Sequence, residues 1–221
     1  MAIKRIMLVR PGETDWNLTG RWQGWVAIPL NEDGKQQVVR LAGFMRNFGV
    51  SEIISSDTRR ALDTSAILGE HLGLEPLVDE RWRERHIGHW QGMILPEVRA
   101  WYPKEYQLML DNLDDYRISG GGESRNDVRR RVKAGFDAVV EKWQDDLSNI
   151  TVGIVTHTTA IRVLLETIMP SVDLKTAEFG NSSVTTVGLT AEGDWKIITL
   201  NDLAHLEGMP ARHMPEVEYD K

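Results

Sequence analysis

Apolar residues in this chain are grouped into short runs that alternate with longer amphipathic stretches. Short apolar runs rich in Ile and Val are typical of buried strands. They predict a series of strands along the chain, closed by a hairpin that turns at Gly193-Asp194. The predicted strands are residues 3–9, 51–55, 75–79, 151–156, 184–190 and 195–200.

Apolar residues at helical spacing predict helices between these strands. Asn31 is a typical N-cap, and apolar residues follow it every three or four positions until Gly49 ends the helix. Two other long helices are predicted over residues 57–72 and 124–147. A further helix, with Ile161, Leu164, Leu165 and Ile168 on one face, is predicted to end before Pro170. Residues 94–118 are predicted to be helical in pieces, with an interruption at Pro103.

The alternation of strands and helices predicts a three-layer α/β/α sandwich with a mainly parallel central sheet and an antiparallel edge. We interpret residues 1–221 as a single domain, because this length fits one compact unit. Residues 94–122 are predicted to form a small cap inserted into it. Residues 10–30 are irregular but rich in Gly and Trp, which indicates a packed, functional loop. Residues 81–92 are dense in polar groups and glycine and are also predicted to be a loop.

Composition narrows the range of functions. The chain has no cysteine, which excludes disulfides, a thiolate metal site and a cysteine nucleophile. Its net charge of -7 argues against a nucleic-acid partner. The chain contains no run of about 18 apolar residues, so a membrane partner is not expected. We therefore expect a cytoplasmic protein. An anionic substrate would need a local basic pocket in it.

Polar residues follow the predicted strands where these end. Arg10 follows the first strand, Arg59 and Arg60 the second, Glu84 lies in the loop after the third, and His157 ends the fourth. Parallel strands end at one edge of a sheet, so these side chains are expected to meet there. Arginine forks bind phosphate oxygens, which predicts a site for a phosphorylated small molecule or an inorganic anion.

Each candidate also has an ordinary structural interpretation. Arg10 is as well suited to a structural ion pair, and Arg59 fits a solvated helix face. His157, at the end of an apolar strand, resembles a satisfied core histidine. Glu13 either supports Arg10 or caps the loop. The tryptophans of the two loops are best explained by core packing, and less well as a wall for an apolar part of a substrate.

Several motifs support the ligand interpretation because they occur in a known order. The chain has Arg10, Gly12, Glu13 and Thr14, followed by Trp16-Asn17. Further motifs lie at residues 55–61, 83–92, 121–124 and 155–157. In this order they resemble the histidine phosphatase (phosphoglycerate-mutase-like) superfamily, over nearly the whole chain.

The resemblance implies roles for individual residues. Arg10, Arg60 and His157 would bind phosphate, with contacts from Asn17 and Gln23. Thr158 is not part of the family pattern, but its hydroxyl or N–H is a further candidate contact for the phosphate. Glu84 would be the general acid. No metal and no cofactor is implied, and His86 and His89 are not expected to ligate a metal or to replace the nucleophile.

Three departures from the family pattern bear on activity. Position 11, where the family carries its phosphate-accepting histidine, is Pro11. Proline has no side-chain nucleophile and no N–H, so it cannot accept a phosphoryl group. Thr158-Thr159 replaces the glycine that usually follows the second histidine, which crowds the pocket. The longer insertion of true phosphoglycerate mutases is absent, which favours the phosphatase branch.

The sequence therefore predicts a phosphomonoester-binding protein of phosphatase ancestry that is inactive or very slow by the phosphohistidine route. One alternative is a non-catalytic pseudoenzyme that senses a phosphorylated metabolite. Another is an inactive variant of an active phosphatase or mutase, in which Pro11 is a recent or introduced change. The sequence leaves the substrate, the pathway and the oligomeric state open, and a homo-oligomer is compatible with it.

Overall fold

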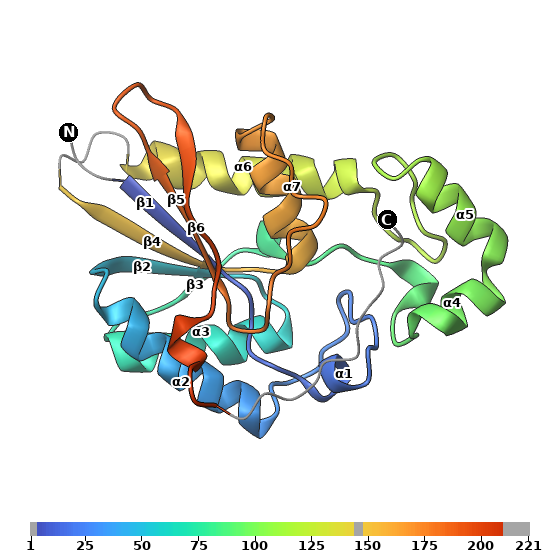
Figure 1. Ribbon diagram of the computed structural model, residues 1–221, viewed down its shortest axis with the longest axis horizontal. Coiled ribbons are helices and arrows are strands. Elements are labelled where there is room, and N and C mark those ends of the chain that lie inside the picture. Colours follow the sequence, from blue (N-terminus) through green and yellow to red (C-terminus); the bar gives the residue numbers. More distant parts are fainter. Residues whose placement is uncertain (1–3, 144–147, 210–221) are drawn as a thin grey trace.

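A six-stranded sheet forms the centre of the computed structural model, which describes residues 4–143 and 148–209 (Figure 1). The strand order is β3-β2-β4-β1-β5-β6. The strands are β1 (Lys4–Val9), β2 (Val50–Ser55), β3 (Leu77–Val78), β4 (Ile150–Val155), β5 (Val184–Leu189) and β6 (Trp195–Asp202). The strands β1 to β4 run parallel, while β5 is antiparallel to both β1 and β6. The predicted α/β fold with a mainly parallel sheet is confirmed.

The register of the central strands brings three strand ends to the same level. Val155 of β4 pairs with Val9 of β1 on one side and with Ser55 of β2 on the other. The hydrogen bonds continue one step further, from Thr156 N to Val9 O and from Ser56 N to Val155 O, each 2.9 Å long. The residues that follow these strands therefore emerge side by side at one edge of the sheet.

Helices cover both faces of the sheet (Figure 1). One face packs against α2 (Glu32–Arg46) and α3 (Arg59–Leu72), and the other against α6 (Arg125–Trp143) and α7 (Thr158–Ile168). Because side chains alternate along a strand, β1 sends Met7 and Val9 to the first core and Ile6 and Leu8 to the second. This two-sided burial explains why residues 6–9, the buried part of β1, are all apolar.

A third group of helices lies beyond the sheet, on the right in Figure 1. It consists of α4 (Leu95–Trp101) and α5 (Pro103–Asp111), which pack on their own small core. That core contains Trp90, Met93, Val98, Tyr106, Met109 and Ile118. Pro103 is the first residue of α5, a position where its missing N–H is tolerated, so the predicted interruption is where a second helix begins.

Most predicted boundaries agree with the structure to within a few residues. The predicted helix at Asp57 begins instead at Arg59, because Thr58 is extended and Asp57 binds Arg83. The two predicted loops contain a short helix, α1 (Asp15–Leu18), and two 3-10 turns at Glu80–Trp82 and Gly88–Trp90; a third turn, Ala204–Leu206, follows β6. The predicted end of the long helix at residue 147 lies outside the described residues. None of the described helices combines the length and apolar character needed to cross a bilayer.

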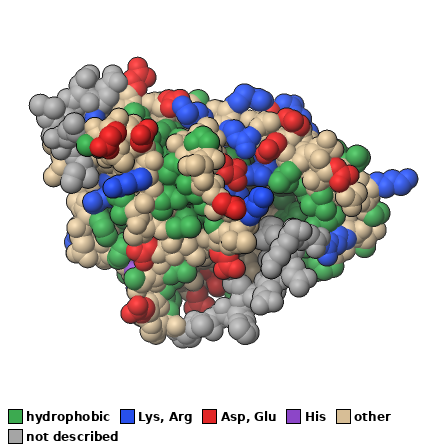
Figure 2. All heavy atoms as spheres, turned by 45° about the horizontal axis from the view of Figure 1, so that its top comes forward, with side chains coloured by type: hydrophobic (Ala, Val, Ile, Leu, Met, Phe, Trp, Pro, Cys, Tyr) green, Lys and Arg blue, Asp and Glu red, His purple; other side chains and the backbone are tan. Residues whose placement is uncertain are grey.

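Charged side chains on the face that carries α6 are interleaved in sign (Figure 2). On α6, Arg125 binds Glu166 of α7 at 2.7 Å, and Lys133 binds Asp137 at 2.6 Å. These cations are balanced by neighbouring carboxylates at the surface. They do not form a broad basic face in this view.

Candidate functional site

The loop after β1 starts the candidate site. Arg10 N donates to Ser183 O at 3.0 Å, and Pro11 O accepts from Ser182 N at 3.0 Å. The Arg10 guanidinium donates to the carbonyl of Phe179. Pro11 is buried and, as a proline, has no N–H that needs a hydrogen-bond partner there.

The same loop lies directly on the N-terminus of α2. A Cβ added to Gly12 would lie 2.5 Å from Gly34 O, and one added to Gly34 would lie 2.2 Å from Glu13 O. Glu13 Oε1 accepts from Asn31 Nδ2 at 2.8 Å, and Glu13 O accepts from Asn31 N at 3.0 Å. Glu13 thus joins the loop to the N-cap of α2, which is one of the two roles expected for it. The second glycine is required here because two backbones touch.

Arg60, in the first turn of α3, carries a buried positive charge. The residue is 5% exposed, and its Nη2 donates to Gly24 O at 2.9 Å. Its Nη1 is also buried and has no hydrogen-bond partner among the described residues. Burial lowers the pKa of Arg60 to about 10, with Glu84 opposing this shift and Arg10 adding to it. The group remains a cation at neutral pH. Arg59, by contrast, is exposed and binds Asp63 at 2.8 Å.

His157 lies where β4 ends and is the N-cap residue of α7. It is 3% exposed, and its Nε2 lies 3.0 Å from Ser56 Oγ and 3.1 Å from Thr58 Oγ1. Burial first, and then the charges of Arg60, Arg131 and Arg10, lower the pKa of His157 well below 6.5. The imidazole is therefore neutral at pH 7.

Glu84 approaches the same edge from the loop between the two 3-10 turns. Its Oε1 accepts from Arg85 N at 2.7 Å, and its Oε2 accepts from Thr159 N at 3.2 Å. Thr159 is in the first turn of α7, where unpaired N–H groups and the helix dipole favour a carboxylate. One helix N-terminus thus positions His157 on its cap residue and Glu84 on its second residue.

The remaining predicted contacts are placed less directly. Asn17 Oδ1 accepts from Thr14 N at 3.0 Å and Gln23 Nε2 donates to Thr14 Oγ1 at 2.8 Å, so both belong to the cap of α1. Thr158 is the first residue of α7 and is partly exposed. Contact of these three side chains with phosphate stays a prediction.

A comparison with known proteins places this arrangement in a family. The family described as "Histidine phosphatase superfamily (branch 1)" matches residues 6–203. The chain belongs to this superfamily. The resemblance expected from the sequence motifs is thereby confirmed.

Curated members of the superfamily align over different lengths. Phosphoglycerate mutase-like protein 4 of Arabidopsis thaliana is 34% identical over 204 residues, covering 91% of this chain and 86% of the relative. Metal-independent phosphoserine phosphatase from the same plant is 30% identical, covering 94% and 85%. Glucosyl-3-phosphoglycerate phosphatase of Mycolicibacterium vanbaalenii is 40% identical over 132 residues, but that alignment covers only 59% of this chain and 57% of the relative.

Solved structures agree with the fold. Bacillus stearothermophilus YhfR has a TM-score of 0.80 at 29% identity, with 92% of this chain and 100% of that chain covered. A mycobacterial glucosyl-3-phosphoglycerate phosphatase in complex with inorganic phosphate has a TM-score of 0.77 at 31% identity, with 91% and 98% covered. The same phosphatase is also known in complex with VO3. Relatives of this fold thus bind phosphate-like anions.

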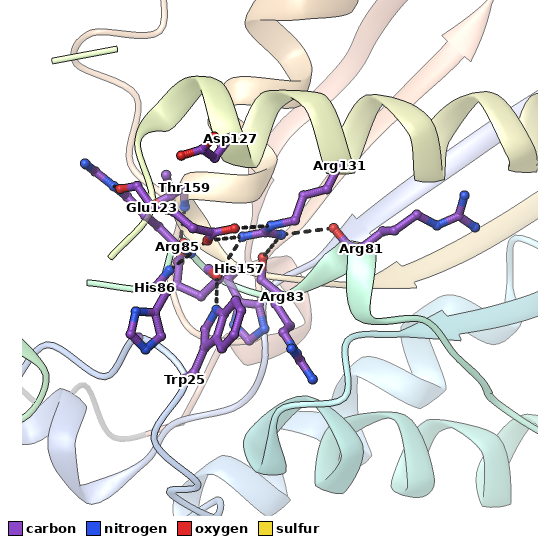
Figure 3. Close-up of polar contacts among 12 residues, drawn as sticks. Trp25, Arg81, Arg83, Arg85, His86, Glu123, Asp127, Arg131, His157 and Thr159 are labelled. Atoms are coloured by element: carbon purple, nitrogen blue, oxygen red, sulfur yellow. Dashed lines mark hydrogen bonds and ion pairs between the residues drawn. The ribbon is translucent and has the colours of Figure 1, made fainter. Parts of the chain in front are cut away.

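In this superfamily member, sequence reasoning identified the residues at the strand ends but missed the groups that hold them. Ser56 and Thr58, which contact His157, lie in a recognised motif without an assigned role. Arg131 was missed altogether, although it lies three residues after buried Val128 and so faces inward on α6. Figure 3 shows its side chain between Glu123 and the backbone of residues 81–84. A cation on the buried stripe of a helix is the signal that would have found it.

Proposed function

We propose that this protein binds a phosphate monoester through Arg10, Arg60 and His157. The observation that carries the proposal is the buried Nη1 of Arg60, a cationic donor without a partner among the described residues. Leaving a buried donor unsatisfied costs about 1–3 kcal/mol, and more for a charged group, so an oxyanion at this position would be strongly stabilising. Backbone N–H groups of the first turn of α7, other than that of Thr159, add further donors for an anion.

The proposal includes phosphatase ancestry with little or no turnover by the phosphohistidine route. Pro11 has no group that can bond to phosphorus. Removing the nucleophile of a catalytic set lowers rates by up to about 10^6-fold in other hydrolases. Glu84 nevertheless remains bound to the N-terminus of α7, close enough to Arg60 to affect its pKa. Retention of this carboxylate favours an inactive variant of a phosphatase over a protein that only senses its ligand.

We further propose that residues 94–122 act as a cap that contacts the part of the substrate beyond the phosphate. Its small core is joined to the loop after α1 by two hydrogen bonds, from Trp22 N to Met93 O at 2.9 Å and from Gly92 N to Trp22 O at 2.8 Å. Trp22 also packs against that core. The cap is therefore continuous with the loop whose Gly24 carbonyl binds Arg60.

The decisive experiment compares the chain as it stands with Pro11→His on a broad panel of phosphate monoesters. We expect Pro11→His to raise phosphatase activity by about 10^3-fold or more, since an imidazole would then face the cationic groups. Pro11→Ala is the matched control, because it removes proline without adding a nucleophile, and it should stay inactive. If Pro11→His were inactive on every ester while phosphate still bound, the sensor interpretation would replace this one.

A further inference from the structure

Glu84 lies in a segment that has no helix or strand of its own. Residues 83–87 connect the turn Glu80–Trp82 to the turn Gly88–Trp90. The only bonds of the Glu84 carboxylate among those the structure shows are to Arg85 N beside it and to Thr159 N on α7. The position of the Glu84 carboxylate relative to Thr159 of α7 therefore depends on what holds the backbone of residues 83–87 in place.

Arg131 of α6 holds that backbone. Its Nη1 donates to Arg81 O at 3.0 Å and to Arg83 O at 2.6 Å, and its Nη2 donates to Glu84 O at 2.8 Å. Three carbonyls that no sheet or helix uses are thus gathered by one guanidinium. Figure 3 shows these bonds radiating from the Arg131 side chain.

Glu123 completes the arrangement from the opposite side. Arg131 Nε donates to Glu123 Oε1 and Nη2 to Glu123 Oε2, both at 2.8 Å. Glu123 Oε2 also accepts from His86 N at 2.9 Å, and Glu123 N donates to His86 O at 2.8 Å. A guanidinium has five N–H donors, and the five bonds of Arg131 match that number. The two side chains are only 17% and 18% exposed, so this pair is a rigid brace.

Trp25 adds a second contact to the backbone carbonyl of Glu84, which Arg131 also binds. Its Nε1 donates to Glu84 O at 2.6 Å, and its ring lies 4.5 Å below the Arg83 guanidinium. The Glu84 carbonyl is therefore held from α6 and from the loop after β1 at once. Neither contact involves the Glu84 carboxylate, whose oxygens accept only from Arg85 N and Thr159 N among the bonds that the structure shows.

We propose that Arg131 and Glu123 are positioning residues that keep the Glu84 carboxyl group at the N-terminus of α7, where it donates a proton to the leaving oxygen. The inference rests on the proposed role of Glu84 as general acid. In Pro11→His, an imidazole nitrogen would bond to phosphorus as the bond to the leaving oxygen breaks. That oxygen takes the electron pair and the proton of Glu84. A displacement of about 1 Å in such a group can lower a rate by about 100-fold.

The first test needs no activity and uses the chain as it stands. An amide proton bonded to a carboxylate shifts as the carboxylate ionises, so the amides of Arg85 and Thr159 should titrate together in NMR spectra and stop doing so in Glu84→Gln. In Arg131→Met we expect the Thr159 response to fall at least two-fold while that of the adjacent Arg85 persists. Glu123→Gln should act in the same direction and serves if Arg131→Met does not fold. An unchanged Thr159 response in both variants, or none in the parent chain, would overturn the inference.

The second test measures leaving-group dependence in the Pro11→His background. A poor leaving group such as an alkoxide needs the acid, whereas nitrophenolate does not. We expect Glu84→Gln and Arg131→Met to lower kcat/KM about 100-fold for an alkyl phosphate and only several-fold for nitrophenyl phosphate. Arg130→Met, one position away and 69% exposed, should change neither.

The two tests separate the inference from the proposed function. If Glu84→Gln lowered kcat/KM equally for both esters, Glu84 would not be the acid and that part of the proposed function would fail. If Glu84→Gln lowered kcat/KM mainly for the alkyl phosphate while Arg131→Met lowered it equally for both esters, Arg131 would be only structural and the inference would fail. If Pro11→His had no activity, the titration of the Thr159 amide would decide the positioning role alone.

Discussion

The two halves of the candidate site are held in place by different means. Arg10 and His157 follow adjacent parallel strands, and the register of Val9 with Val155 determines how far apart they begin. Glu84 does not directly follow a strand, and side chains hold its loop, chiefly Arg131 from a helix far along the chain. The half with Arg10 and His157, which we call the strand-end half, therefore depends on the backbone ladder of the sheet. The half with Glu84, the loop half, depends on a few side-chain bonds.

This difference determines what a single substitution can do. A ladder shares its stability among many backbone bonds, so one side chain can change the chemistry at its end without moving it. Pro11 illustrates this, because its neighbours Arg10 and Gly12 keep their N–H bonds, to Ser183 O and to Thr64 Oγ1 at 3.2 Å. A loop held by a few side chains has less reserve, since losing the Arg131 guanidinium leaves several polar groups unsatisfied at once.

The largest effect should come from removing the support of the Glu84 loop. Arg131→Met leaves the partly buried Glu123 carboxylate and three carbonyls without their cation, so we expect it to lower the free energy of unfolding by about 3 kcal/mol. Arg130→Met should change it by less than about 1 kcal/mol, because the Arg130 side chain is exposed and its partner Asp127 keeps its bonds to Arg117 and Ser124. Urea denaturation of both variants measures the contrast. Equal losses would mean that the loop does not depend on Arg131.

The strand-end half, together with Arg60 at the start of α3, can be probed by measuring anion affinity. Arg60→Met removes the buried guanidinium, and we expect it to weaken binding of inorganic phosphate by about 2–3 kcal/mol, roughly 30- to 150-fold in Kd. The neighbouring Arg59→Met is the matched control, since Arg59 is exposed and paired with Asp63. Isothermal titration calorimetry gives both values. Similar affinities for the two variants would count against a phosphate site at Arg60.

The support of the loop after β1 can be tested within one helix. Gly34→Ala places a Cβ 2.2 Å from Glu13 O, and we expect it to destabilise the fold by about 2 kcal/mol. Gly43→Ala, also in α2, meets no atom within 4 Å and should stabilise the helix by about 0.5–1 kcal/mol. Thermal unfolding of the pair measures both. A neutral Gly34→Ala would show that the two backbones can separate freely.

The smallest effect concerns how His157, in the strand-end half, makes the free energy of unfolding depend on pH. The pKa of His157 lies well below 6.5 in the folded state, so below that pH the unfolded chain binds a proton that the folded chain does not. The stability is complete above pH 6.5 and falls as the pH is lowered, by at most about 1.4 kcal/mol per pH unit for this group. His157→Gln should flatten this dependence in unfolding measured between pH 7 and 5. An identical slope in both proteins would contradict it.

Much of the fold could be predicted from local patterns. The apolar residues within 3–9 and 151–156 predicted β1 and β4, because the part of a strand that is buried on both faces is largely apolar. Asn31 and Pro103 marked helix starts through their own backbone and capping chemistry. The start of α3 was predicted two residues early, because a bond between Asp57 and Arg83, 26 residues apart, is not visible in local sequence.

The sequence by itself determined which groups the candidate site contains: two arginines, a histidine and a carboxylate after strands or in loops, and a proline at position 11. It determined this because side-chain chemistry and strand periodicity are local properties. Only the tertiary structure decided that Arg60 is buried with a donor atom that no described residue satisfies, that His157 is neutral, and that Arg131 and Glu123 hold the loop of Glu84. Burial and long-range pairing depend on which segments the sheet register and helix packing bring together, and no single stretch of the chain contains that information.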